Sequence, residues 1–272
     1  MRRALIVGAA LLAWPGRADA QQCHSLNRSS WRSQGLLTGV RLDAAAYRNA
    51  RYEGDWQGLA PTLAYSHPRV TAMAMLPAYR LNRNGRPGYG IGDLTLAVRA
   101  PVPAWSTDRL SVGFGVAATL PTGKASEDLG MGHVMLMPEF WWIHEMDRVQ
   151  LFGAVGFGRA LAGKSASHHH AAGPAPIVNP MNLSEIDATL GAFVRVHRLV
   201  WLKMSGFGAM PVGTANANGV TRVMLTQGVA VNVRNVELSA ELQAPLTGQP
   251  FLLRGVVQVG YRFDLGGRRR RR

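Results

Sequence analysis

The connectors between strand-length segments alternate in length along this chain. Between Leu36 and Asp264 the sequence divides into twelve such segments, and short connectors follow every second segment while longer ones follow the others. A barrel that spans a membrane must close on itself, with tight turns on the periplasmic side and longer loops outside. The spacing therefore predicts an all-β fold, a transmembrane antiparallel up-and-down β-barrel of about 12 strands.

Hydrophobic periodicity places the strands, because successive side chains of a strand point to opposite faces of the sheet. We expect strands over residues 36–48, 56–66, 69–81, 90–100, 109–121, 132–144, 148–162, 184–197, 199–211, 220–234, 236–244 and 251–263. Residues 82–89 should form one of the longer outer loops, and the connector 101–108 is longer than a periplasmic turn should be.

The last segment shows the alternation most clearly. Its apolar face is predicted to consist of Phe251, Leu253, Val257, Val259, Tyr261 and Phe263. The preceding segment points Glu237 and Glu241 to the other face, where carboxylates require water or partners. Aromatic residues also fall at the periplasmic end of three strands, as expected for rings at headgroup level: Trp142, Trp201, Tyr261 and Phe263. One face should therefore meet lipid and the other a polar interior.

The N-terminus has the pattern of a cleaved Sec signal peptide over residues 1–20. Arg2 and Arg3 precede an apolar run from Ala4 to Trp14, and Ala18-Asp19-Ala20 has the small-x-small form of a cleavage site. The run is shorter than the roughly 20 residues that a membrane-spanning helix needs. We therefore expect export to the outer membrane of a Gram-negative cell, with residues 21–35 as a periplasmic leader or partial plug.

Charge and cysteine content limit the partners of the chain. The formal net charge of the full sequence is +14, and five of the positive charges lie in the run Arg268 to Arg272. An exported chain seldom meets nucleic acid, and no aromatic platform lies beside this run, so we expect residues 265–272 to be a solvated basic tail rather than a nucleic-acid site. Cys23 is the only cysteine, which excludes an intramolecular disulfide.

Two short strings carry a family resemblance. Gly90-Ile-Gly-Asp-Leu94 opens the fourth expected strand, and Leu120-Pro-Thr-Gly-Lys124 ends the fifth. Together, over about residues 85 to 160, they resemble the MetA-pathway phenol-degradation family of outer-membrane channels. The resemblance implies a β-barrel transporter that passes small compounds, including hydrophobic or aromatic ones, and it implies no catalytic residue. Read by themselves, the strings are equally well explained as turn and register devices.

Charged residues on the expected inner face are the candidate selectivity residues. The main candidates are Asp93, Arg99, Glu139, Asp187, Lys203, Arg222, Glu237, Glu241 and Arg254. Glu185, Arg195, Arg234 and Arg262 share the expected inner face. Opposite charges can pair across a narrow bore. Such pairs would leave either a constriction that selects solutes or a closed polar core.

The longest loop contains His168, His169 and His170, which could ligate a divalent metal. Three adjacent histidines seldom complete one tetrahedral site, so a solvent-exposed loop is the competing interpretation. No Gly-x-Ser-x-Gly motif is present, and Ser184 with Glu185 or Ser111 with His133 lack any motif context. We therefore expect no enzyme activity and no cofactor.

The function predicted from the sequence is a passive outer-membrane channel for small solutes. The alternative is a non-conducting surface barrel whose histidine-containing loop binds metal or a partner. The expected partners are outer-membrane lipid and lipopolysaccharide, the barrel-insertion machinery and the solutes themselves. We expect a monomer.

Overall fold

A computed structural model of the chain describes residues 34–48, 53–162, 178, 181–213, 219–248 and 251–265. The strands are β1 (Gly35–Arg48), β2 (Glu53–His67), β3 (Val70–Met75), β4 (Ala78–Arg83), β5 (Arg86–Ile91), β6 (Leu94–Pro101), β7 (Leu110–Leu120), β8 (Val134–Glu145), β9 (Val149–Ala162), β10 (Ser184–His197), β11 (Val200–Pro211), β12 (Arg222–Val233), β13 (Val236–Thr247) and β14 (Phe251–Asp264). Two short 3₁₀ helices, η3 (Pro103–Trp105) and η4 (Ala125–Glu127), lie in connectors. No helix in these ranges is long and apolar enough to cross a membrane.

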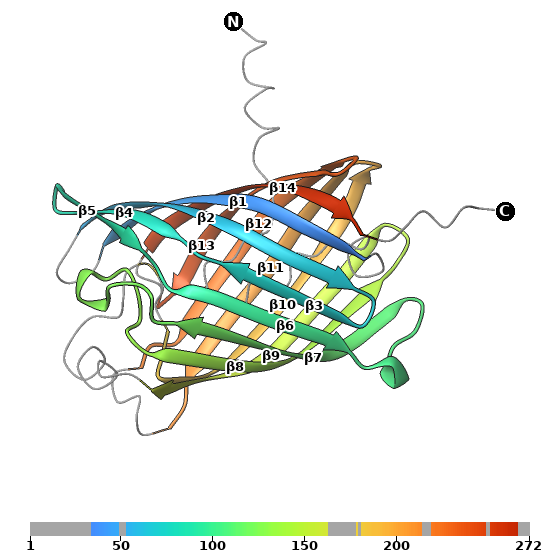
Figure 1. Cartoon of the computed structure of the whole chain (residues 1–272), viewed down its shortest axis with the longest axis horizontal. Helices are drawn as coiled ribbons and strands as arrows, with labels where there is room; N and C mark the ends of the chain where they lie inside the picture. The colour runs from blue at the N-terminus through green and yellow to red at the C-terminus, as the bar shows by residue number, and fades with distance from the viewer. Residues whose placement is uncertain are drawn as a thin grey trace, which may run out of the picture.

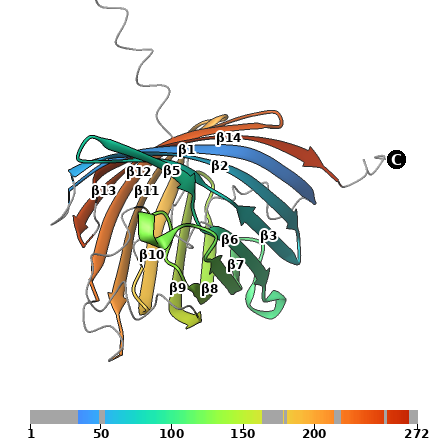
Figure 2. The same cartoon turned by 60° about the vertical axis from the view of Figure 1, so that its left-hand side comes forward.

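The fourteen segments form twelve strands of one closed antiparallel barrel (Figures 1 and 2). Segments β3 and β4 both pair with β2 and together make one strand, which is interrupted at Leu76 and Pro77. Segments β5 and β6 make the next strand, which is interrupted at Gly92 and Asp93. Strand β1 pairs with β14 from Gly35 to Tyr47, so the first and last strands close the cylinder. The predicted fold class is confirmed.

The two ends of the barrel differ as the connector lengths predict. The turns between β2 and β3, β8 and β9, β10 and β11, and β12 and β13 contain two or three residues, and they lie at the end where β1 begins and β14 ends. We call this the short-turn end. The connector 121–133 between β7 and β8 lies at the opposite end, which we call the long-loop end.

One expected loop is wrong. Residues 82–89 form a tight hairpin instead, because Asn84 and Gly85 have φ angles of 50° and 83° and connect β4 directly to β5. Positive φ at both central residues is the geometry of the Asn-Gly type I′ turn, whose twist matches the twist of the flanking strands. The strands therefore continue through residues that were predicted to be loop.

The outer face of the barrel is apolar. Leu42, Ile186 and Val259 are among the large apolar side chains that are exposed, and their neighbours in sequence are buried. Phe251 was expected on this face but is 4% exposed and packs inside, because a register shift between Ala46 and Tyr47 changes the facing of β14 near its start. Such a face can contact acyl chains without exposing a backbone edge.

The long connector between β6 and β7 folds back on the outside of the barrel. Trp105, at the end of η3, is 55% exposed and contacts Phe114 edge-on, and Phe114 contacts Phe140 in the same way. The additional length of this connector therefore places an amphipathic ring on the outer wall near the short-turn end, where aromatic belts of membrane barrels lie.

Candidate functional site in the barrel lumen

The nine main candidate residues all lie on the inner face or beside it, and almost no solvent reaches them. Glu139 is the most accessible, with its side chain 11% exposed, and the other eight residues are buried. One further candidate was placed wrongly: Arg234 lies in the exposed turn to β13 with φ of 53°. Arg195 shares the inner face with Asp187 and Phe193. Its guanidinium lies 5.6 Å from the centroid of the Trp201 ring and donates to the Asp147 carbonyl at the short-turn end.

Two ion pairs cross an intervening strand above a glycine. Arg99 on β6 donates to both carboxylate oxygens of Glu139 on β8, from Nε at 2.5 Å and from Nη2 at 2.8 Å. Gly115 on β7 is the register partner of both residues. Lys203 on β11 pairs in the same way with Glu241 on β13, and Gly228 on β12 is the partner of both. Because glycine has no side chain, the middle strand leaves the space in which the two charged side chains make contact.

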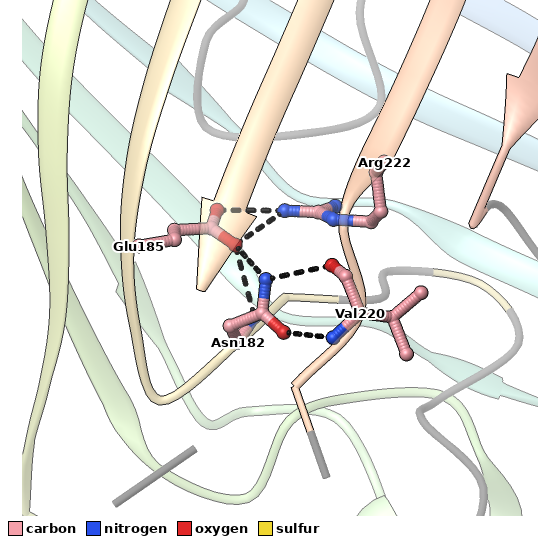
Figure 3. Close-up of polar contacts among 4 residues, drawn as sticks. All are labelled: Asn182, Glu185, Val220 and Arg222. Carbon is pink, nitrogen blue, oxygen red and sulfur yellow. Dashed lines mark hydrogen bonds and ion pairs between the residues drawn. The ribbon is translucent and has the colours of Figure 1, made fainter. Parts of the chain in front are cut away.

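A third pair joins two strands at the long-loop end (Figure 3). Arg222 Nη2 donates to both oxygens of Glu185, at 2.7 and 2.6 Å. The side-chain amide of Asn182 donates to Glu185 at 2.8 Å and to the carbonyl of Val220 at 3.1 Å, and its oxygen accepts from the Val220 amide at 2.9 Å. This network connects the residues before β10 to those before β12, and its charges are fully paired.

Sequence reasoning missed the partner of Arg254. Arg254 on β14 forms an ion pair with Asp43 on β1, and Arg41 lies 3.7 Å from the same carboxylate. All three side chains are buried. The sequence carries a signal for this pair, because Arg41 and Asp43 alternate with the exposed apolar residues Val40 and Leu42. Arg262 and Glu237 form a further buried pair at 2.5 Å.

Asp93 has a different role from the other candidates. Its carboxylate accepts hydrogen bonds from the backbone amides of Gly123, at 2.9 Å, and Met131, at 2.6 Å. Thr122 donates to the Gly92 carbonyl at 2.7 Å and accepts from the Leu94 amide at 2.9 Å. The two strings that carry the family resemblance therefore bind each other, at the break between β5 and β6. Asp93 anchors the connector 121–133, which we call the strap.

Apolar side chains from opposite walls meet inside the barrel at the long-loop end. Leu129 of the strap and Val178 belong to the same buried cluster as residues of six strands. The cluster consists of Ala45, Tyr47, Trp56, Tyr79, Leu81, Leu129, Val178, Phe207, Ala209, Met224 and Phe251. We call it the apolar layer. It crosses the lumen, so the strap and Val178 close a path that the wall alone would leave wider.

A second aromatic group lies nearer the short-turn end. Trp141, Phe152 and Phe193 form a buried cluster against which Trp201 packs. Trp201 was expected at headgroup level. Strand β11 pairs with β12 without a register shift, so Trp201 shares the inner face with Lys203.

The histidine run 168–170 lies outside the described residues. Within the described ranges, no group of three or more His, Cys, Asp or Glu side chains is arranged to hold a metal ion.

Comparison with known proteins shows which solved structures share this fold. No protein-family model matches the sequence, and no curated protein matches it. Among solved structures, the COG4313 outer membrane channel from Pseudomonas putida F1 superposes with a TM-score of 0.65 and 12% identity, covering 88% of this chain and 100% of that one.

Two porins superpose less closely. The KdgM porin has a TM-score of 0.52 and 7% identity, covering 84% of this chain and 99% of that one. The NanC porin has a TM-score of 0.51 and 9% identity, covering 84% and 100%. At these identities the likeness is one of fold, and the chain therefore has the fold of outer-membrane β-barrel channels.

Proposed function

We propose that this chain is an outer-membrane channel through which small solutes, including hydrophobic or aromatic compounds, diffuse down their own gradient. The proposal is supported by the kind of residues that block the lumen: some of them belong to connectors rather than to strands. The strand ladder is closed, whereas the apolar layer that crosses the lumen depends on Leu129 and Val178, which lie in connectors between strands. A connector can move without breaking the ladder, because the wall keeps its own hydrogen bonds.

The solute class follows from what the apolar layer presents. Trp56, Tyr79 and Phe207 offer aromatic surface in a barrel whose deeper lumen carries paired charges. Aromatic surface favours apolar and aromatic solutes, and paired charges give little net attraction to either sign of ion. The family resemblance implies the same class of solute.

The strap is the element that we propose moves. Asp93 holds it through two backbone amides, and Gly123 and Gly130 leave the room for that carboxylate, since a Cβ on Gly130 would stand 2.3 Å from Asp93 Oδ1. Arg83 on β4 adds an ion pair to Asp128 of the strap, at 3.2 Å. The resting barrel is therefore narrow, and passage requires the strap to leave the apolar layer.

Planar-bilayer conductance tests this proposal. We expect the wild-type barrel to give small, brief current steps, and Asp93→Ala to give larger or longer ones, because the strap loses its anchor. Glu127→Ala is the matched control, since Glu127 lies on the strap but pairs only with the exposed Lys124 among the contacts described. Steps that survive replacement of His168, His169 and His170 by alanine assign the current to the lumen.

One observation favours the alternative function, a non-conducting barrel. Arg99, Lys203, Arg222 and Arg254 are all 6% exposed or less, as they would be in a closed polar core. If Asp93→Ala and the wild type are both silent while heat-modifiable gel mobility shows an intact barrel, passive transport is excluded. Metal affinity that disappears with the histidine run would then support the surface-binding function.

We also propose that the barrel contacts outer-membrane lipid, lipopolysaccharide and the barrel-insertion machinery. The apolar outer face suits lipid and lipopolysaccharide, and insertion of a closed barrel requires the assembly machinery of the outer membrane. We propose a monomer, because one chain closes the cylinder by pairing β1 with β14.

A further inference from the structure

Three sulfur donors and one nitrogen donor lie at alternate positions of the chain where the strap joins β8. Met131, His133, Met135 and Met137 occupy every second position, and their exposed fractions are 0%, 0%, 0% and 5%. The residues between them are less buried. Met135 and Met137 lie two apart on β8, so their side chains point to the same side of the sheet. Met131 and His133 lie in the strap just before β8, on either side of the bend at Gly132, and both are fully buried.

Two further methionines, one on another strand and one in a connector, lie beside these residues. Met181, before β10, belongs to the same buried cluster, and Met73 on β3 packs against it. Alanines separate the methionines across the sheet: Met73 is paired with Ala97, Ala97 with Ala117, and Ala117 with Met137. The chain has 11 methionines in total, so five of them in one cluster is a concentration that the rest of the barrel does not show.

Two methionine side chains converge beside a carboxylate-bearing residue. From the position that a Cβ on Gly158 would occupy, Met135 Cε lies at 2.9 Å, and Met137 Cγ and Glu185 Cγ both lie at 3.3 Å. Gly158 is the register partner of Glu185. Asp93 lies at the other end of this group of donors, where it accepts the Met131 amide. Two acidic side chains therefore flank a group of neutral donors.

The donor types select the ligand. Thioether sulfur is a soft, polarisable donor that binds Cu(I), and imidazole binds copper as well, whereas magnesium and calcium require oxygen. An apolar cluster could be filled by leucine, so packing does not by itself require sulfur. Neutral donors leave the charge of a bound cation uncompensated. Glu185 is already paired with Arg222, whereas the Asp93 carboxylate is bonded to two backbone amides, so Asp93 is the acidic group that reduces the cost of burying a cation here.

We propose that Met131, His133, Met135, Met137 and Met181 form a binding site for a soft monovalent cation, Cu(I) or Ag(I), in the barrel lumen. We call this group the methionine site. It is independent of the histidine run 168–170 and of whether the barrel conducts.

The test measures Cu(I) affinity of the full-length, detergent-solubilised barrel by competition with bicinchoninate under anaerobic, reducing conditions. We expect one Cu(I) per barrel. The double variant Met135→Leu/Met137→Leu keeps the apolar volume but removes two sulfurs, so its affinity for Cu(I) should fall by a factor of about ten or more. Met204→Leu is the matched control, because Met204 is 63% exposed on the outer face. It should bind as the wild type does.

Two further measurements keep the proposal falsifiable. Replacing His168, His169 and His170 with alanine should leave Cu(I) binding intact, and copper-edge X-ray absorption should show sulfur as well as nitrogen neighbours. Unchanged affinity in the leucine variant, loss of binding only with the histidine run, or a spectrum without sulfur would each overturn the proposal. If the double variant does not assemble, Met181→Leu makes the same test from outside the strands.

Discussion

Arg99 and Glu139 form a two-hydrogen-bond ion pair although strand β7 lies between their own strands. The contact passes over Gly115, which is paired in register with both residues. Lys203 and Glu241 repeat the arrangement over Gly228. Gly115 and Gly228 therefore make these ion pairs possible, because each leaves room for two long side chains from the neighbouring strands.

Gly115→Ala should destabilise the barrel. The new Cβ would stand 2.7 Å from Glu139 Oε1 and 2.8 Å from Arg99 Cγ, so the pair must shift. We expect the free energy of unfolding to fall by about 1–3 kcal/mol, as for other overpacked sites. Gly255→Ala is the matched control, since nothing lies within 4 Å of its Cβ position. Urea unfolding of both variants in lipid vesicles measures the difference, and equal losses would contradict the prediction.

Glu241→Leu should cost far more than Glu241→Leu combined with Lys203→Met. The single change leaves the Lys203 ammonium buried without its partner, at a cost of roughly 3–5 kcal/mol, whereas the double change replaces the pair by apolar side chains. The Arg48–Glu53 pair supplies a control, because both side chains are more than 60% exposed and Glu53→Gln should leave the free energy of unfolding nearly unchanged. A double-mutant cycle in urea decides, and additive effects would refute the prediction.

Thr122→Val should loosen the strap. Valine has the shape of threonine but neither donates to the Gly92 carbonyl nor accepts from the Leu94 amide. We expect a loss of about 1–2 kcal/mol and faster cleavage by Lys-C after Lys124, whose side chain is exposed. Thr122→Ser keeps the hydroxyl and should be cleaved nearly as slowly as the wild type. Cleavage of all three proteins at one rate would show that Thr122 does not hold the strap.

Trp105 should report contact with lipid headgroups. It is 55% exposed on the outer wall, whereas Trp56 is fully buried in the apolar layer. Brominated lipids quench tryptophans that they can reach, so Trp105→Phe should reduce the quenched fraction of the fluorescence. Trp56→Phe should leave that quenched fraction unchanged or raise it. The opposite ranking would place the bilayer elsewhere on the barrel.

The sequence was sufficient for the strand positions and for most inward charges. Connector lengths and period-two alternation are local properties, so they indicated twelve strands and placed Glu237 and Glu241 inside. Errors arose where turn chemistry or register overrode the simple pattern. The Asn84–Gly85 turn extended two strands, and a register shift turned Phe251 inward.

Only the tertiary structure decided which residues meet. Asp93 and Gly123 are 30 residues apart in sequence, and Asp43 and Arg254 are 211 apart, so no local pattern could pair them. Which residues pair depends on the register between neighbouring strands and on closure of the cylinder. Both follow from hydrogen bonding summed around the whole barrel. The chain by itself determined a barrel with a polar interior, and the closed fold determined how its charges, its strap and its methionines are brought together.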